Sequence, residues 1–336
     1  MSDSAYGSLI SSWMQVLRTQ NLAEGRRVDP VSRWLLIVRA SVFPMTLTSG
    51  LIGGLLAADV GVDWASFLLA VVGLLLAHAG NNMINDYFDF ESGLDTEGYV
   101  RVLYAPHPVA SGLITRAGLL AAIVAVNLAD LAILLYLVQR RGPWVAAFAV
   151  AGLLISVFYV APPIRLKHRG LGEPGVALVW GPLMIGGCYY VAAGETPAWV
   201  YLASIPYALL VTTVLFGKHI DKLESDSDRG IRTLPVLLGA DRALAWARAM
   251  MAGFFVTVVI LVASSVLPPW VMLVLFALPR LRETMKVFGA PAPAEPPAGY
   301  PIWPLWYVAW AFRLTRFAGS LFVLGLAINL LVPWSL

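Results

Sequence analysis

The strongest constraint on the fold is a succession of long apolar segments separated by short polar connections. Hydrophobic residues make up 59% of the 336 residues, and charged residues only 13%. Long, continuous apolar runs are typical of membrane-spanning helices, whereas a membrane β-barrel has short alternating segments. We therefore predict an all-α, polytopic membrane protein, with the lipid bilayer as a partner and no nucleic acid. The nine predicted spans cover residues 34–59, 64–86, 117–138, 145–160, 175–193, 199–220, 243–266, 270–287 and 313–332.

The distribution of lysine and arginine predicts the orientation of these spans. Basic residues concentrate in the N-terminal segment and in alternate connections after it. Such an excess marks the cytoplasmic side of a membrane. We therefore expect a cell-membrane protein whose N-terminus and polar site loops are cytoplasmic. Residues 1–33 are expected to form a cytoplasmic segment, with residues 8–18 either an interfacial amphipathic helix or an irregular start, and residues 34–336 the membrane domain.

A polar and acidic cluster closes the second apolar segment, within residues 81–95. On a helix, Asn82, Asp86 and Asp89 would share one face, at positions i, i+4 and i+7. Ionisable groups at membrane depth are costly and usually bind something. Carboxylate and amide oxygens suit Mg²⁺, which commonly joins one or two carboxylates to a substrate phosphate. The alternative is a solvated acidic helix end.

A second acidic cluster follows the sixth apolar segment, within residues 218–235. On a continuous helix, Asp221, Glu224 and Asp228 would share a face, and Asp226 would point elsewhere unless the helix had already ended. The two clusters could face each other across a bundle and hold two metal ions with a diphosphate between them. The alternative is a charged loop in which aspartates pair with neighbouring lysines and arginines.

A basic loop lies between the two clusters, within residues 158–173. Pro162 and Pro163 stop the preceding helix. The cations that follow lie on the side of the acidic clusters, where they could bind diphosphate oxygens that the metals leave free. The alternative is an ordinary cytoplasmic basic loop. The residues of this stretch assigned to substrate binding are Tyr159, Arg165, Lys167 and Arg169.

Three further side chains near these clusters are candidates for the site. Arg39, inside the first predicted span, either reaches the interface with its long side chain or faces the cavity. Lys218, just before the second cluster, joins the basic residues assigned to the substrate. His219 is either a proton acceptor or a hydrogen-bonded helix end.

The residues quoted so far carry a resemblance to a known family. The pattern Asn82-x-x-x-Asp86-x-x-Asp89 resembles the first aspartate-rich motif of the UbiA superfamily of intramembrane prenyltransferases, and residues 221–234 resemble the second. The loop at 159–173 resembles the connection between them. Within the superfamily, residues 34–239 are most similar to the 1,4-dihydroxy-2-naphthoate polyprenyltransferases of menaquinone synthesis.

Two departures from that branch lie beside the second motif. The branch usually has an Asn-Asn-x-Arg run before its second aspartate, whereas this chain has Gly217-Lys218-His219-Ile220. The spacing between Asp221 and Asp226 is also one residue longer than usual.

The resemblance implies nine helices around a central cavity that opens sideways to lipid. It also implies Mg²⁺-dependent transfer of a prenyl group from a polyprenyl diphosphate to an aromatic acceptor, through an allylic cation, with two ions expected. Asp86, Asp89 and Asp221 would be catalytic. The expected metal ligands are Asn82, Asp86, Asp89, Asp221 and Asp226, with Glu224 as a further candidate. The expected substrate-binding residues are Arg39, Asn82, Tyr159, Arg165, Lys167, Arg169 and Lys218. The alternatives are a membrane terpene cyclase of the same superfamily and, from another class, a cation-coupled transporter.

Overall fold

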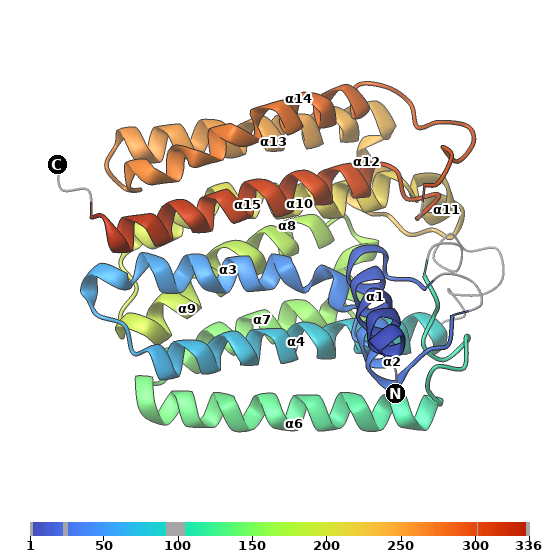
Figure 1. Cartoon of the computed structure of the whole chain (residues 1–336), viewed down its shortest axis with the longest axis horizontal. Helices are drawn as coiled ribbons and strands as arrows, with labels where there is room; N and C mark the ends of the chain where they lie inside the picture. Colours follow the sequence, from blue (N-terminus) through green and yellow to red (C-terminus); the bar gives the residue numbers. More distant parts are fainter. Residues whose placement is uncertain (1–2, 23–25, 92–104, 301, 334–336) are drawn as a thin grey trace.

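The computed structural model describes residues 3–22, 26–91, 105–300 and 302–333, and these ranges are helical apart from their connections (Figure 1). The α-helices are α1 (Asp3–Thr19), α2 (Pro30–Ile37), α3 (Phe43–Leu56), α4 (Trp64–Glu91), α6 (Arg116–Arg141), α7 (Trp144–Val160), α8 (Gly172–Leu178), α9 (Met184–Ala193), α10 (Ala198–Ile220), α11 (Leu223–Asp228), α12 (Leu234–Leu238), α13 (Ala240–Ala263), α14 (Leu278–Val287) and α15 (Tyr307–Leu331). The 3₁₀ and π segments are η1 (Ala40–Val42), η2 (Ala58–Val60), η3 (Leu166–His168), η4 (Val179–Leu183) and η5 (Pro269–Ala277). The long helices run side by side, and α1, α2, α11 and α12 gather at one end of them.

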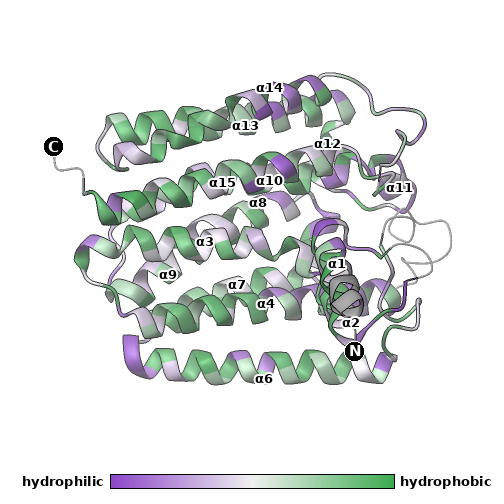
Figure 2. Ribbon diagram, in the orientation of Figure 1, coloured by the Kyte–Doolittle hydropathy of each residue, from purple (hydrophilic) through white to green (hydrophobic). Residues whose placement is uncertain are grey.

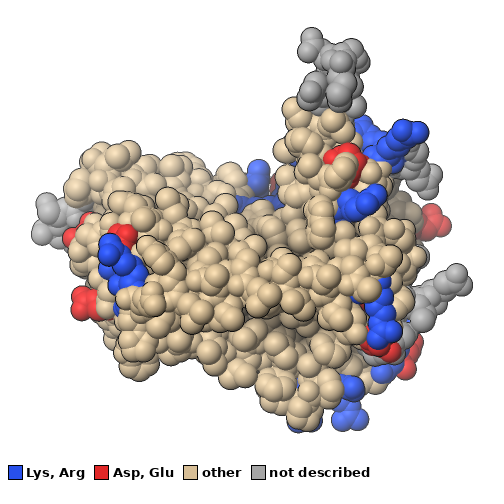
Figure 3. Space-filling view, turned by 90° about the horizontal axis from the view of Figure 1, so that it is seen from below, with Lys and Arg blue, Asp and Glu red and all other residues tan. Residues whose placement is uncertain are grey.

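Seven helical segments of the described chain are long and apolar enough to cross a membrane, which confirms a multi-pass helical membrane protein. They are Ala40–Val60, Trp64–Glu91, Arg116–Arg141, Gly172–Ala193, Ala198–Ile220, Ala240–Ala263 and Tyr307–Leu331. Helix α7 is apolar but shorter, and the predicted eighth span is divided between η5 and α14. The total of nine spans therefore stays a prediction. The long helices are largely apolar (Figure 2). Most of the charged side chains gather toward two ends of the molecule, and the band between them is largely uncharged apart from basic side chains at its upper edge (Figure 3).

The prediction of one continuous first span over residues 34–59 is wrong at its N-terminal end. Helix α2 ends at Ile37, and Arg39 adopts the left-handed conformation (φ 54°) before η1 and α3 begin. Pro44 lies in the first turn of α3, where a proline fits because its missing N–H would have no helical partner. Arg39 therefore lies at a break between helices, not within a span.

The N-terminal segment is helical in its first part, so of the two alternatives the helix is the one observed. Asp29 caps α2 by accepting hydrogen bonds from the backbone N–H groups of Val31 and Ser32. The indole N–H of Trp13, on α1, also donates to Asp29 (2.9 Å). The start of α2 is therefore tied to α1, although the location of α1 at a membrane interface stays a prediction.

The fifth predicted span contains a break that the sequence analysis did not place. Pro182 and the non-helical Gly181 interrupt the chain between α8 and α9. A Cβ atom on Gly181 would lie 2.6 Å from the Cβ of Ala208, so α10 approaches the backbone closely here. Ser49 on α3 donates to the carbonyl of Trp180 (2.6 Å), which satisfies a group that the break exposes.

The last helix begins earlier than predicted, at Tyr307 instead of residue 313. Helix α10 lies directly against its first turn, because a Cβ on Gly217 would be 2.8 Å from the backbone nitrogen of Val308. Residues 289–304, predicted as a loop, lie outside helices where the structure describes them. The start of α15 is thus fixed next to the end of α10, where the second acidic cluster lies.

Candidate functional site

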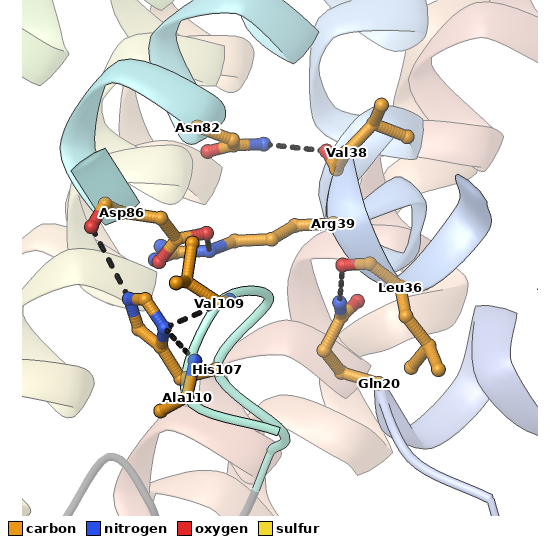
Figure 4. A network of polar contacts seen from close by, with 9 residues as sticks. All are labelled: Gln20, Leu36, Val38, Arg39, Asn82, Asp86, His107, Val109 and Ala110. Atoms are coloured by element: carbon orange, nitrogen blue, oxygen red, sulfur yellow. Dashed lines mark hydrogen bonds and ion pairs between the residues drawn. The ribbon is translucent and has the colours of Figure 1, made fainter. Parts of the chain in front are cut away.

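The first acidic cluster lies on the last turns of α4, which continues without a break to Glu91, and residues 92–95 lie outside the described part. Asp86 is fully buried. Arg39 forms an ion pair with it, donating from Nη2 to Oδ1 and from Nε to Oδ2, the latter at 3.2 Å (Figure 4). The imidazole Nε2 of His107 lies 3.2 Å from the backbone oxygen of Asp86. The helix break at Arg39 therefore brings its guanidinium to the acidic face of α4. Of the two predicted positions of Arg39, at the membrane interface or facing the cavity, this contact favours the second.

Two asparagines extend the polar face of α4. The side-chain amide of Asn82 donates to the carbonyl of Val38 (3.0 Å), next to the break (Figure 4). Asn85 lies three residues further along the same face, and its Oδ1 is buried with no hydrogen-bond partner in the described part of the chain. The sequence analysis did not assign Asn85 to the site, although its spacing from Asn82 was the available signal.

The second acidic segment is not one continuous helix, so of the two arrangements left open by the sequence, the structure has the one in which the helix has already ended. Helix α10 ends at Ile220 and α11 begins at Leu223. The carboxylate of Asp221 accepts hydrogen bonds from the backbone N–H groups of Tyr307 (2.8 Å) and Val308 (3.0 Å). It caps the first turn of α15, where four N–H groups lack helical partners.

Lys222 and Asp226 form a buried pair in this segment. The ammonium of Lys222 lies 3.2 Å from Oδ1 of Asp226, four residues later, and their side chains are 4% and 0% exposed. The unusual spacing noted in the sequence has a structural explanation. Counting back from Asp226 by the spacing that is usual in the resembling branch leads to Lys222. Asp221 lies one residue earlier, and its carboxylate is turned toward α15.

Carboxylates from both acidic clusters affect the pKa of Lys222. Burial and the neighbouring Lys167 lower the pKa of Lys222 to about 8, while Asp226 and, from α4, Asp89 act to raise it. The same two carboxylates act to raise the pKa of His168, which burial lowers. Carboxylates from the ends of α4 and α11 therefore lie within interaction range of one buried ammonium, with Lys167, only 7% exposed, beside them.

A buried acid holds the loop after α7 against the second cluster. Glu173 accepts a hydrogen bond from the backbone N–H of Leu234 (3.4 Å), and its Oε1 lies 2.6 Å from Nδ1 of His219. Arg169 and Arg232 form a parallel β-bridge between the same two loops. His219 is hydrogen-bonded at the end of α10, and its role as a proton acceptor stays a prediction. Glu173 has a positioning role that the sequence analysis did not assign.

The remaining candidates divide between the cavity and the surface. Tyr159 and Lys218 line the cavity described below. Arg165, Arg169 and Glu224 are exposed, and Arg169 donates to the carbonyl of Pro163 (3.1 Å). Substrate binding by the two arginines and metal binding by Glu224 stay predictions.

A cavity of about 780 Å³ extends from this site into the bundle. Its polar end is lined by Arg39, Asn82, Asn85, Tyr159 and Lys218, and its deeper wall is largely apolar, with Leu134, Leu137, Phe148, Met184 and Val211 among the lining residues. The arrangement is that of a binding site with a charged end and a long apolar compartment.

The donor set fits a hard divalent cation shared with a phosphate ligand. Within the described ranges, no three histidine, cysteine, aspartate or glutamate side chains form a closed metal site. Mg²⁺ keeps several waters and needs only a few protein oxygens when a phosphate completes its shell. The acidic face of α4 offers such oxygens, and the buried Oδ1 of Asn85, which has no hydrogen-bond partner in the described ranges, lies on the same helix face.

Comparison with known proteins adds two findings. A model described as the UbiA prenyltransferase family matches residues 46–300. The chain is 29% identical over 255 residues to a 1,4-dihydroxy-2-naphthoate octaprenyltransferase of Bacillus subtilis, covering 73% of this chain and 79% of the relative. It is 27% identical over 215 residues to UbiA prenyltransferase domain-containing protein 1 of Danio rerio, covering 61% of each.

Solved structures share the fold at lower identity. A UbiA homologue of Archaeoglobus fulgidus bound to GPP and Mg²⁺ aligns with a TM-score of 0.61 and 14% identity, covering 88% of this chain and 99% of that chain. A homologue of Aeropyrum pernix aligns with a TM-score of 0.61 and 17% identity, covering 86% and 98%.

Proposed function

The chain belongs to the UbiA prenyltransferase family, and on this premise we propose that it transfers a prenyl group from a polyprenyl diphosphate to an aromatic acceptor of the quinone-precursor type. That it is a membrane prenyltransferase follows from the family and from the naphthoate octaprenyltransferase relatives. The observations that carry the more specific proposal are the electrostatic effect of both Asp89 and Asp226 on the buried Lys222 and the nearby cavity, which has a polar end and an apolar interior.

The proposed ligands of Mg²⁺ are the oxygens of the α4 face and of the second acidic segment. They are Asn82, Asn85, Asp86, Asp89 and Asp226, with Asp221 and Glu224 as the further predicted ligands. When bound, Mg²⁺ neutralises diphosphate charge and favours departure of this leaving group. Asp221 would have to give up its hydrogen bonds to α15 before it could bind an ion.

The chain's own cations have a defined part in the proposed reaction. Lys167, Lys222 and Arg39 lie at the acidic clusters, where they would stabilise the charge that develops on the diphosphate. The C1–O bond breaks with both electrons going to the diphosphate, leaving an allylic cation. An aromatic carbon of the acceptor then forms the new bond to C1, and its proton passes to the departed diphosphate, which restores the aromatic ring.

The cavity would protect the cation. Its apolar walls take up the prenyl chain and exclude water, which would otherwise capture the cation. The ring of Tyr159 lines the polar end, where an aromatic face attracts a cation. We place this end on the cytoplasmic side of the cell membrane because the predicted connections there carry most of the lysine and arginine.

The test is a reaction with purified protein in detergent, a prenyl diphosphate and a dihydroxynaphthoate acceptor. We expect Mg²⁺-dependent release of diphosphate and an acceptor whose mass increases by one prenyl group. Prenyl products formed without acceptor would identify a cyclase instead, and cation movement without diphosphate release would identify a transporter.

A further inference from the structure

One face of α15 carries arginines that the proposed chemistry does not use. The guanidinium of Arg280, from α14, lies 3.8 Å from the ring centroid of Phe317. Arg313 lies 5.5 Å from the ring of Trp310, and Arg316 lies 4.6 Å from the ring of Phe312. Rings that stack on guanidinium groups hold them in place without neutralising their charge. We call Arg280, Arg313 and Arg316 the arginine face.

The arginine face has no carboxylate partner within the residues that the structure describes. The ion pairs of the described chain involve other cations. Arg316 donates from Nη2 to the carbonyls of Leu17 and Ser41, and its Nε is buried with no hydrogen-bond partner in the described ranges. A buried guanidinium N–H without an acceptor is costly, so this atom points to a ligand that supplies one.

The arginine face belongs to the same cavity as the proposed diphosphate site. Arg280, Arg313 and Arg316 line it together with Arg39. Ser41, whose carbonyl accepts from Arg316, is two residues from Arg39, and Arg39 binds Asp86. The acidic residue among the cavity's described lining is Asp130 on α6, and α6 and α14 lie at opposite edges of the bundle (Figure 1). An anion on the arginine face would thus share the cavity with Arg39, while the acidic lining residue lies on a helix at the opposite edge of the bundle.

We infer that the arginine face binds the carboxylate of an aromatic-acid acceptor. The identification of this ligand as the acceptor rests on the proposed function. Guanidinium groups bind carboxylates with paired, charge-assisted hydrogen bonds. Phe312, which also lines the cavity, offers an apolar surface to the aromatic ring. The ring then extends from the arginine face toward Arg39 and Asn82, where the prenyl cation forms.

The test measures binding without any donor, so it does not depend on turnover. Purified protein is titrated with 2-naphthoate and with the uncharged 2-naphthamide, and binding is followed by calorimetry. Because a charge-assisted pair is absent in the amide, we expect naphthoate to bind about tenfold more tightly or better. Equal affinities would overturn the inference.

The variants Arg280→Gln and Arg313→Gln, and the two combined, test whether the arginine face causes the preference for naphthoate over naphthamide. Neither guanidinium makes a hydrogen bond in the described chain, so these changes should leave the fold intact. We expect the combined variant to lose most of the preference for naphthoate. The matched control is Arg282→Gln on the same helix, since Arg282 is exposed and outside the cavity lining. Unchanged preference in the combined variant would contradict the assignment.

The phosphate of a lipid headgroup is an alternative anion that the guanidinium groups of the arginine face could bind. Repeating the titrations in nanodiscs of phosphatidylcholine, with and without phosphatidylglycerol, separates the two. If the arginine variants lose phosphatidylglycerol binding while naphthoate binding is unchanged, the face binds lipid and the inference fails. Arginine-dependent naphthoate binding without any prenyl transfer would support the inference and refute the proposed function. With active protein, the combined variant should raise KM for a carboxylate acceptor and leave KM for the prenyl diphosphate unchanged.

Discussion

The two acidic segments look alike in sequence but are used differently in the structure. On α4 the helix continues past its acidic residues, so Asn82, Asp86 and Asp89 keep the common face that their spacing predicts. After α10 the helix stops at Ile220, and the carboxylates separate. Asp221 binds the backbone of α15, whereas Asp226 faces the ammonium of Lys222. The difference shows that spacing predicts which side chains share a face only where the backbone stays regular.

The largest expected effect is a loss of turnover on substitution of an acidic residue of α4, the segment in which the helix stays continuous. Asp86→Asn should lower turnover by about a thousandfold, because it removes a charged metal ligand at the leaving group. Diphosphate release by the variant and the wild type measures this. Asp228→Asn, in the exposed part of the second segment, is the control and should retain activity. Comparable losses in both variants would remove the distinction between the segments.

The next effect concerns the buried pair of the second segment. Lys222→Met should lower the free energy of unfolding by about 3 kcal/mol, because Asp226 then lies buried without this ammonium. Thermal unfolding in detergent gives the change. The combined variant Lys222→Met/Asp226→Leu should regain most of the stability, since an apolar pair has no buried charge, but not the turnover. Recovery of turnover in that variant would show that the pair serves only the fold.

A smaller effect is expected at Asp221. Asp221→Ala should cost about 1–2 kcal/mol, because the N–H groups of Tyr307 and Val308 lose their acceptor. Turnover measured well below the melting temperature should fall less than in Asp86→Asn. A thousandfold loss with an unchanged melting temperature would instead favour Asp221 as a metal ligand.

A pH dependence is also expected from the same residue. Burial raises the pKa of Asp221 from 3.8 to about 7, against the lowering effect of the backbone N–H groups it binds. The folded state therefore holds the proton more tightly than the unfolded chain. This stabilisation is fully present below pH of about 4 and is lost as the pH rises through about 7. Without Mg²⁺, the melting temperature should fall between pH 5 and pH 7, and Asp221→Asn should reduce that decrease. An equal decrease in the variant would assign it to other groups.

The sequence predicted those parts of the molecule that depend on local pattern. Apolar length predicted the helical membrane fold, and the spacing of Asn82, Asp86 and Asp89 predicted the α4 face. The break at Arg39 was missed because the apolar run continues across it, although Pro44 was a signal for a helix start. No local pattern could have revealed the role of Asp221, because its partners lie 86 and 87 residues away.

The hydrogen bonds from α15 to Asp221 have a consequence for the choice of substrate. The same helix carries Arg313 and Arg316, six and nine residues after the capped Tyr307, or about 9 and 14 Å along its axis. One carboxylate thus fixes how far the arginines stand from the diphosphate end. If the arginine face binds the acceptor as inferred above, this anchored helix would set the acceptor length, because the acid has to span from the arginines to the site where the prenyl cation forms.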